Sequence, residues 1–160
     1  MPSGDLKVGT LRIKYSGIFD VNELFEFMHS WFASYNYDSF LKKHSEEKKG
    51  NGYFIDYEWA AERKISDYIN FTVSSVLSIS KANPVIVVEN GEKIKRFKGN
   101  IFIEMSAKAN RDPYNKFGKL QFMGHIYDKY FLDEEGIKKK LGGELKDYHK
   151  GIKVLLGITK

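Results

Sequence analysis

Apolar and polar residues alternate with a period of two through the middle of the chain. The longest alternating stretch covers residues 53–80 and is broken once, near Ser66 and Asp67. In its first half, Ile55 and Trp59 fall on one face. Since successive side chains of a strand point to opposite faces, each half predicts a strand with one buried and one solvated face. The break between the halves predicts an antiparallel hairpin.

Shorter segments with the same alternation predict further strands before and after this hairpin. Residues 11–15 predict a first strand, and residues 100–109 predict a late one. Upstream of the late strand, Asn90 and Gly91 lie between two alternating segments, a pattern typical of a two-residue type I′ hairpin turn. Gly99 follows and predicts a bulge or a turn, because glycine is typical of both.

Three segments change to the period of an α-helix. In residues 21–35, apolar side chains recur at i, i+3, i+4 and i+7, which predicts an amphipathic helix. Asp20 and Glu23 have the spacing of a capping box at its start. After the last strand, residues 120–131 and 137–156 each carry an apolar stripe and predict C-terminal helices.

These elements follow one another in the order strand, helix, four or five strands, and helices. The order predicts an α+β fold, with an antiparallel sheet of five to six strands and helices packed mainly on one face. The whole chain, residues 1–160, is expected to form a single domain. Residues 42–52 contain no apolar side chain, so we expect an exposed charged loop or a flexible hairpin tip there.

The order β-α-(β)n-α resembles the helix-grip arrangement of START-like domains. In that arrangement a curved sheet wraps a long C-terminal helix around an apolar cavity. The resemblance covers most of the chain and consists of the order of elements, without a sequence motif. It implies a pocket between the sheet and the last helix that would take an apolar small molecule.

Composition places the chain among ordinary globular proteins. Hydrophobic residues make up 42% and charged residues 29% of its 160 residues, which excludes an intrinsically disordered chain. No apolar run is long enough for a membrane span, and the N-terminus lacks the layout of a secretory signal. We therefore expect a location in the cytoplasm or in a particle assembled there. Because cysteine is absent, disulfides, thiol catalysis and thiolate metal sites are excluded.

The net charge is positive and comes mainly from lysine. It amounts to +5, with 22 Lys and 4 Arg. A basic chain favours anionic partners, but arginine, which makes bidentate contacts to phosphate and guanine, is scarce. The predicted last helix is the most basic element. Its candidate contacts to nucleic acid or another anion are Lys138, Lys139, Lys140, Lys146, Lys150 and Lys153. The alternative is that these lysines only solvate the outer side of an amphipathic helix.

Residues able to carry chemistry form no recognisable motif. The histidines, none of which has a partner at the helical spacing of a zinc site, are His29, His44, His125 and His149. The carboxylates that share the polar face of the predicted strands, where Lys or Ser neighbours would pair with them, are Asp56, Glu58, Glu62 and Glu104. No phosphate-binding loop or nucleophile elbow occurs. We therefore expect a protein that is not an enzyme and that uses no catalytic residue, metal or cofactor.

Aromatic residues are abundant, at 15% of the chain. Most of those in residues 53–80 share one face of the predicted strands, where they favour core packing over a base-stacking platform. Three others fall outside the predicted apolar faces, and exposed aromatic side chains are typical of protein interfaces. These three, the candidate partner interface, are Phe27, Phe54 and Phe102.

Three functions stay open at this point. The first is a non-enzymatic interaction or assembly protein that self-associates or binds a protein partner, for example as a structural component of a virus-like particle. The second is a nucleic-acid-binding protein that uses the Lys-rich last helix. The third is a helix-grip-type binder of an apolar small molecule.

Overall fold

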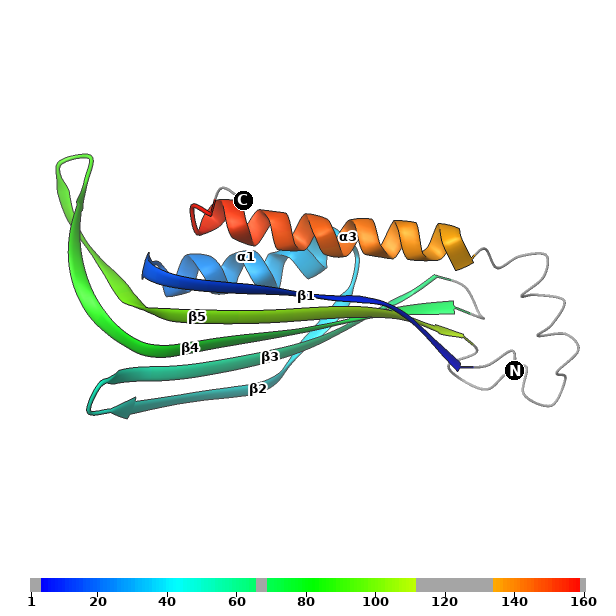
Figure 1. Cartoon of the computed structure of the whole chain (residues 1–160), viewed down its shortest axis with the longest axis horizontal. Coiled ribbons are helices and arrows are strands. Elements are labelled where there is room, and N and C mark those ends of the chain that lie inside the picture. The colour runs from blue at the N-terminus through cyan, green and yellow to red at the C-terminus, as the bar shows by residue number, and fades with distance from the viewer. Residues whose placement is uncertain (1–3, 66–68, 112–133, 159–160) are drawn as a thin grey trace, which may run out of the picture.

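The computed structural model describes residues 4–65, 69–111 and 134–158, which form a five-stranded antiparallel sheet and two helices (Figure 1). The strands are β1 (Gly4–Phe19), β2 (Asp38–Lys49), β3 (Gly52–Lys64), β4 (Ile69–Glu89) and β5 (Glu92–Arg111), and the helices are α1 (Val21–Ser34) and α3 (Glu134–Leu155). The strands lie in the order β1-β5-β4-β3-β2. This confirms the predicted antiparallel sheet and the α+β class.

The strands bury the face that the alternation assigned to the core. Residues at every second position of β4, from Ile69 to Ile79, are buried, and the intervening residues are more exposed except Asn70, which is also buried. Both helices lie on this inner face, and no described helix covers the opposite face (Figure 1). The largest fully buried side chains of the sheet are Trp59, Phe71, Leu77, Ile79, Ile103 and Met105.

Helix α1 begins where the capping pattern predicted. The Asp20 carboxylate accepts hydrogen bonds from the backbone N–H groups of Asn22 and Glu23, at 3.0 and 3.3 Å. These bonds satisfy two of the donors that a helix start leaves unpaired. The buried stripe of α1 includes Leu24 and Phe32 and faces the sheet.

Helix α3 crosses the inner face with a single buried stripe. Leu141, Leu145, Tyr148 and Ile152 are each at most 2% exposed, and their spacing of three and four residues places them on one side of the helix. The other predicted C-terminal helix, residues 120–131, lies outside the described residues.

Residues 42–52 form the end of the β2–β3 hairpin, so of the two predicted alternatives the structure has the hairpin and not an irregular loop. Every residue from 42 to 51 is exposed, as expected, but β2 continues to Lys49 and only Gly50 and Asn51 form a turn. β2 is an edge strand that pairs only with β3 and carries no helix on most of its length. Because both of its faces meet water, it needs no apolar alternation, and the pattern that reveals the other strands is missing.

β4 and β5 extend beyond the helices as a bent hairpin, which we call the arm (residues 83–98). The bend occurs at a bulge in β4 between Ser80 and Asn83. Gly99 lies across from it, and a Cβ atom there would approach the backbone of Ala82 to 2.8 Å. The predicted irregularity at Gly99 is therefore real, but the extra residue belongs to β4 and glycine provides the space.

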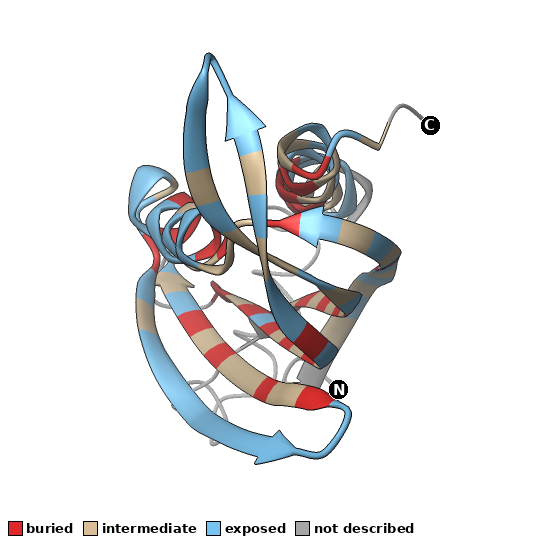
Figure 2. Ribbon diagram, turned by 90° about the vertical axis from the view of Figure 1, so that its left-hand side faces the viewer, coloured by how far each residue is buried: buried red, intermediate tan, exposed pale blue. Residues whose placement is uncertain are grey.

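The tip of the arm has the turn that its sequence predicted. Asn90 and Gly91 both have positive φ, at 51° and 81°, and Glu89 pairs with Glu92 on either side. Positive φ at both central residues is the signature of a type I′ turn. The arm bends towards the side of the sheet that carries the helices (Figures 1 and 2).

Candidate functional site: a charged pocket beside helix α3

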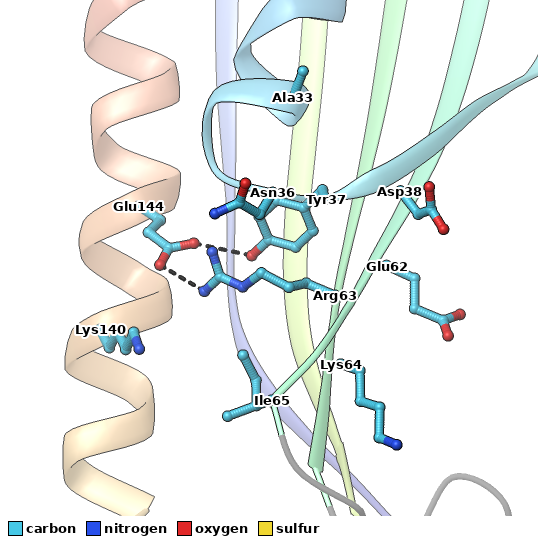
Figure 3. A pocket seen from close by; sticks show the side chains of 10 residues that line it. All are labelled: Ala33, Asn36, Tyr37, Asp38, Glu62, Arg63, Lys64, Ile65, Lys140 and Glu144. Atoms are coloured by element: carbon cyan, nitrogen blue, oxygen red, sulfur yellow. Dashed lines mark hydrogen bonds and ion pairs between the residues drawn. The ribbon is translucent and has the colours of Figure 1, made fainter.

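A hollow of about 940 Å³ lies between the end of α1, the end of β3 and the first half of α3 (Figure 3). The Tyr37 phenol and the Ile65 side chain contribute to its wall. Its charged lining residues are three cations and three carboxylates: Arg63, Lys64, Lys140, Asp38, Glu62 and Glu144. Such a concentration of both signs of charge at one hollow makes it the candidate functional site.

A nearly buried ion pair joins β3 to α3 at the inner end of the pocket. Arg63 Nη2 lies 2.8 Å from Glu144 Oε2, and the two side chains are only 15% and 10% exposed. The Tyr37 hydroxyl donates a hydrogen bond to Glu144 Oε1 at 3.0 Å. Arg63 Nη1 donates to the backbone oxygen of Tyr35 at 2.7 Å. Both carboxylate oxygens and both terminal guanidinium nitrogens therefore have partners, as buried charges require.

Two aromatic rings hold the guanidinium in place. The central carbon of Arg63 lies 4.7 Å from the ring centre of Tyr37 and 5.3 Å from that of Phe71. A planar guanidinium stacks well on such rings and is attracted to their faces. Arg63 is thus fixed by rings as well as by the carboxylate, and it holds α1, β3 and α3 together.

Two phenols of this region stay protonated well above neutral pH. Burial raises the pKa of Tyr37 far above its usual value of 10.0, and the Glu144 carboxylate raises it further. The pKa of Tyr35 is also raised, first because its hydroxyl donates a 2.8 Å hydrogen bond to Asp147. Both hydroxyls consequently act as hydrogen-bond donors to carboxylates, and neither suits the role of a base near neutral pH.

The mouth of the pocket, in contrast, has polar side chains that form no interaction with other described residues. The side chains of Asn36, Asp38 and Lys140 are exposed, and they make no hydrogen bond or ion pair with the rest of the protein that the structure describes. Asn36 and Lys140 lie towards α3, whereas the Asp38 carboxylate projects with Glu62, its neighbour across the β2–β3 pair, on the other side of the strands (Figure 3). The pocket can therefore bind a small molecule at its mouth while its inner ion pair maintains the shape.

Five of the six lysines predicted as anion contacts fall into two groups, and Lys138 belongs to neither. Lys140 lines the charged pocket (Figure 3). Lys139, Lys146, Lys150 and Lys153 are spaced by one or two helical turns and so lie on one stripe of α3, away from its buried side. All six predicted lysines of α3 except the half-buried Lys153 are exposed, and none forms an ion pair among the described residues.

The three aromatics of the candidate partner interface lie in different surroundings. Phe27 faces α3 rather than solvent: its ring is stacked near Tyr148, and a Cβ atom on Gly151 would lie 2.4 Å from it. This contact explains why Phe27 falls off the buried stripe of α1. Phe54 and Phe102 are half-buried on the sheet face opposite the helices.

Several of the other residues weighed for chemistry have structural partners. His149 lies 3.0 Å from the backbone oxygen of Arg12, and His44 stacks on a tyrosine of β3. Asp56 accepts a hydrogen bond from Ser78 at 2.7 Å, and Glu104 pairs with Arg12 at 2.8 Å. His125 lies outside the described residues. Among the described residues, no group of three or more potential ligands is placed to hold a metal ion.

Sequence reasoning missed the residues at the centre of the pocket, although a signal for two of them exists. Arg63 continues the inner-face series of β3, since it follows Trp59 and Ala61 at every second position. Glu144 lies beside Leu145 and one turn before Tyr148, within the apolar stripe of α3. A charged residue at a position that periodicity assigns to the core is rare and needs a partner. One such residue on each element points to a buried pair.

Comparisons with known proteins give no identity. No family model matches the chain, and no curated protein matches it. Among solved structures, an uncharacterized protein from Rhizobium leguminosarum is similar at 15% sequence identity and a TM-score of 0.21, covering 81% of this chain and 96% of its own. A likeness at this level carries no inference about fold or function. In the residues that the structure describes, no helix has the length and apolar character to cross a membrane.

Proposed function

We propose that the chain is a helix-grip-type binding protein that holds a small polar molecule at the charged pocket. The observation that carries this proposal is the position of the pocket, which lies where α3 meets the inner face of the sheet and is built around the Arg63–Glu144 pair. The resemblance to START-like domains in the order of elements supports it. In that arrangement, ligands lie between the sheet and the long last helix.

The composition of the interior favours a polar ligand over an apolar one. In the core, Trp59 of β3, Phe71 of β4 and Tyr148 of α3 are each at most 1% exposed, and the Tyr148 hydroxyl lies 3.0 Å from the Ser75 hydroxyl. This close packing takes up the space that an apolar ligand of a helix-grip protein would need. The large hollow lies at the end of the core, where the lining is charged.

The groups at the mouth define the ligand class. Lys140 offers an ammonium group, Asp38 a carboxylate and Asn36 an amide, all without a partner within the described chain. A molecule that places a negative group against Lys140 and reaches past the start of β2 to Asp38 with a positive group satisfies this set, whereas a simple anion uses Lys140 alone. The proposed ligand is therefore zwitterionic, such as a free amino acid.

Nuclear magnetic resonance titration of the ¹⁵N-labelled protein tests this proposal with four probes. These are L-lysine as a zwitterion, citrate as an anion, spermidine as a cation and palmitate as an apolar acid. We expect L-lysine to give saturable shifts at residues 36–38, 62–65 and 140–144. The variant Lys140→Ala should weaken binding about tenfold, the cost of one charged hydrogen bond, while Lys146→Ala on the outer stripe should not. Saturation by palmitate alone, or by no probe, would contradict the proposal.

A second candidate function, nucleic-acid binding, is favoured by the outer stripe of α3. Its four lysines are aligned and form no ion pair with the residues that the structure describes, so their fields add along one side of the helix. The test is the binding of a DNA duplex at increasing salt, because phosphate contacts lose affinity steeply as salt rises. The double variant Lys146→Ala/Lys150→Ala should bind more weakly and with a smaller salt slope than Lys42→Ala/Lys43→Ala on β2. Equal binding by the two variants would show that the lysine stripe of α3 is not the DNA contact.

A further inference from the structure

A hollow of about 400 Å³ lies at the root of the arm, where β1, β4 and β5 meet. Lys81 of β4 and Lys98 of β5 are the only charged residues among its described lining residues. The other lining residues are polar or are glycines: Ser16, Gly17, Asn83, Gly99 and Asn100. Asn100 directly precedes the buried Ile101, so its side chain and the hollow lie on the outer face of the sheet, opposite the helices.

The strands around this hollow carry lysines without carboxylates. No Asp or Glu occurs in residues 14–19, 76–88 or 93–103. The side chains of Lys81 and Lys98 are exposed and form no ion pair with the residues that the structure describes. Lys14, which is also exposed, precedes Ser16 by two positions and so lies on the same face of β1. The hollow therefore attracts anions, because positive charges gather there and these segments provide no carboxylate to balance them.

The hollow also offers hydrogen-bond donors. The Ser16 hydroxyl donates to Asn100 Oδ1 at 2.6 Å, which orients the Asn100 amide. The Nδ2 group of this amide donates to no other described residue, so it is left to bind a ligand. Asn83 Nδ2 donates to the backbone oxygens of Asn51 and Lys81, at 3.3 and 3.4 Å, and so supports the bulge of β4. Two ammonium groups and one amide, from β4 and β5, therefore surround one hollow with donors.

The backbone at Lys81 is strained. Lys81 lies in the bulge of β4 and has a φ of 53°. The other described non-glycine residues with positive φ are Asn36 and Asn90, and asparagine is much more common in this conformation than lysine. Glycine would adopt it without strain. The bulge itself therefore does not require lysine, and strained residues of this kind are typical of functional sites.

We propose that this hollow is a phosphate-binding site, in which Lys81 and Lys98 neutralise the phosphate and Asn100 donates a further hydrogen bond. A phosphate monoester carries a charge of about −1.5 to −2 near neutral pH and has three acceptor oxygens. It therefore matches two ammonium groups and one amide, whereas a carboxylate has a single charge and leaves one lysine unmatched. Lysine is a common phosphate ligand in proteins. The site shares no residue with the charged pocket and does not depend on the ligand proposed there.

Nuclear magnetic resonance titration of the ¹⁵N-labelled protein at low salt tests this proposal. We expect inorganic phosphate and glycerol 3-phosphate to give saturable shifts at residues 16–17, 81–83 and 98–100, and sodium chloride at the same ionic strength not to reproduce them. Co-sedimentation with phosphatidylcholine vesicles that contain phosphatidic acid then identifies the source of the phosphate. Binding to these vesicles, but not to pure phosphatidylcholine, assigns the site to a lipid headgroup. Binding of glycerol 3-phosphate without binding to the vesicles assigns it to a soluble phosphate ester.

Substitutions separate the role of the lysine side chains from that of the backbone. Lys98→Ala and Lys81→Gly should each weaken the binding of glycerol 3-phosphate about tenfold, whereas Lys43→Ala, which removes the same charge from β2, should not. Lys81→Gly should keep or raise the urea midpoint, because glycine relieves the strain at this φ. Absence of saturable shifts, or equal losses from Lys98→Ala and Lys43→Ala, overturns the proposal. A lower urea midpoint for Lys81→Gly shows that this lysine has a structural role in the bulge and overturns its assignment as a phosphate ligand.

Discussion

The Arg63–Glu144 pair should contribute far more to stability than an ion pair of the same length elsewhere in the protein. Arg12 and Glu104 provide the comparison, since both pairs are Arg–Glu and both span 2.8 Å. The side chains of the pocket pair are 15% and 10% exposed, and those of the surface pair are 58% and 40% exposed. The two pairs therefore differ mainly in burial.

The expected magnitudes follow from what each substitution leaves behind. Glu144→Leu removes the partner of a nearly buried guanidinium and leaves the Tyr37 hydroxyl without its acceptor. Breaking such a pair costs about 3 kcal/mol, which is on the order of a hundredfold in the unfolding equilibrium. Glu104→Leu breaks an exposed pair and should cost less than about 1 kcal/mol.

Urea denaturation followed by tryptophan fluorescence measures both effects, because Trp31 lies against α3 and Trp59 lies in the core. The double variant Arg63→Met/Glu144→Leu should be less destabilised than the sum of its single variants, since no charge is then left unpaired. Equal losses from Glu144→Leu and Glu104→Leu would refute the assigned role of burial. Additive single variants at the pocket would show that Arg63 and Glu144 do not act as a unit.

Two further predictions concern the packing of α3. Gly151→Ala would place a Cβ atom against Phe27, whereas the Cβ atom of Gly143→Ala would meet nothing within 4 Å. In urea titrations, Gly151→Ala should therefore be less stable than Gly143→Ala by about 1 kcal/mol or more. Equal stability of the two variants would contradict the close contact. Burial raises the pKa of Tyr148 above the value of 10.0 for an exposed phenol. Its contribution to stability is therefore fully present below about pH 10 and is lost as pH rises towards the folded-state pKa, because the unfolded chain releases the proton first. Urea midpoints measured above pH 10 should fall more steeply for the unaltered protein than for Tyr148→Phe, and parallel curves would contradict this.

The elements that could be predicted are those whose signal is local. The start of α1 depends on Asp20 and on side chains within one turn of it, and the tip of the arm depends on Asn90 and Gly91. The inner face of β3 and β4 follows from alternation alone, because one side meets the helices and the other does not. In each case the residues that produce the structure are neighbours in the sequence.

The features that were missed depend on partners far apart in the sequence. β2 is a strand because β3 pairs with it, although its own side chains are exposed and mostly charged. Arg63 is stabilised by Glu144, 81 positions later, and neither residue has a charged partner nearby in the sequence that would reveal the pair. Whether the sheet and the last helix leave room for an apolar ligand likewise depends on a long-range property, the packing between them. Periodicity identifies the residues that face the interior without showing whether they fill it.

The position of β1 has a consequence for how the chain reaches its folded state. β1 is synthesised before β2, β3, β4 and β5, yet it pairs with β5, and the bonded residues Arg12 and Glu104 are 92 positions apart. The other four strands follow one another in the same order in the sequence and in the sheet, from β2 to β5. They can therefore pair one after another as they are synthesised. β1 can pair only after β5 has been synthesised. Because this pairing closes a long loop, it is a late and slow step of folding.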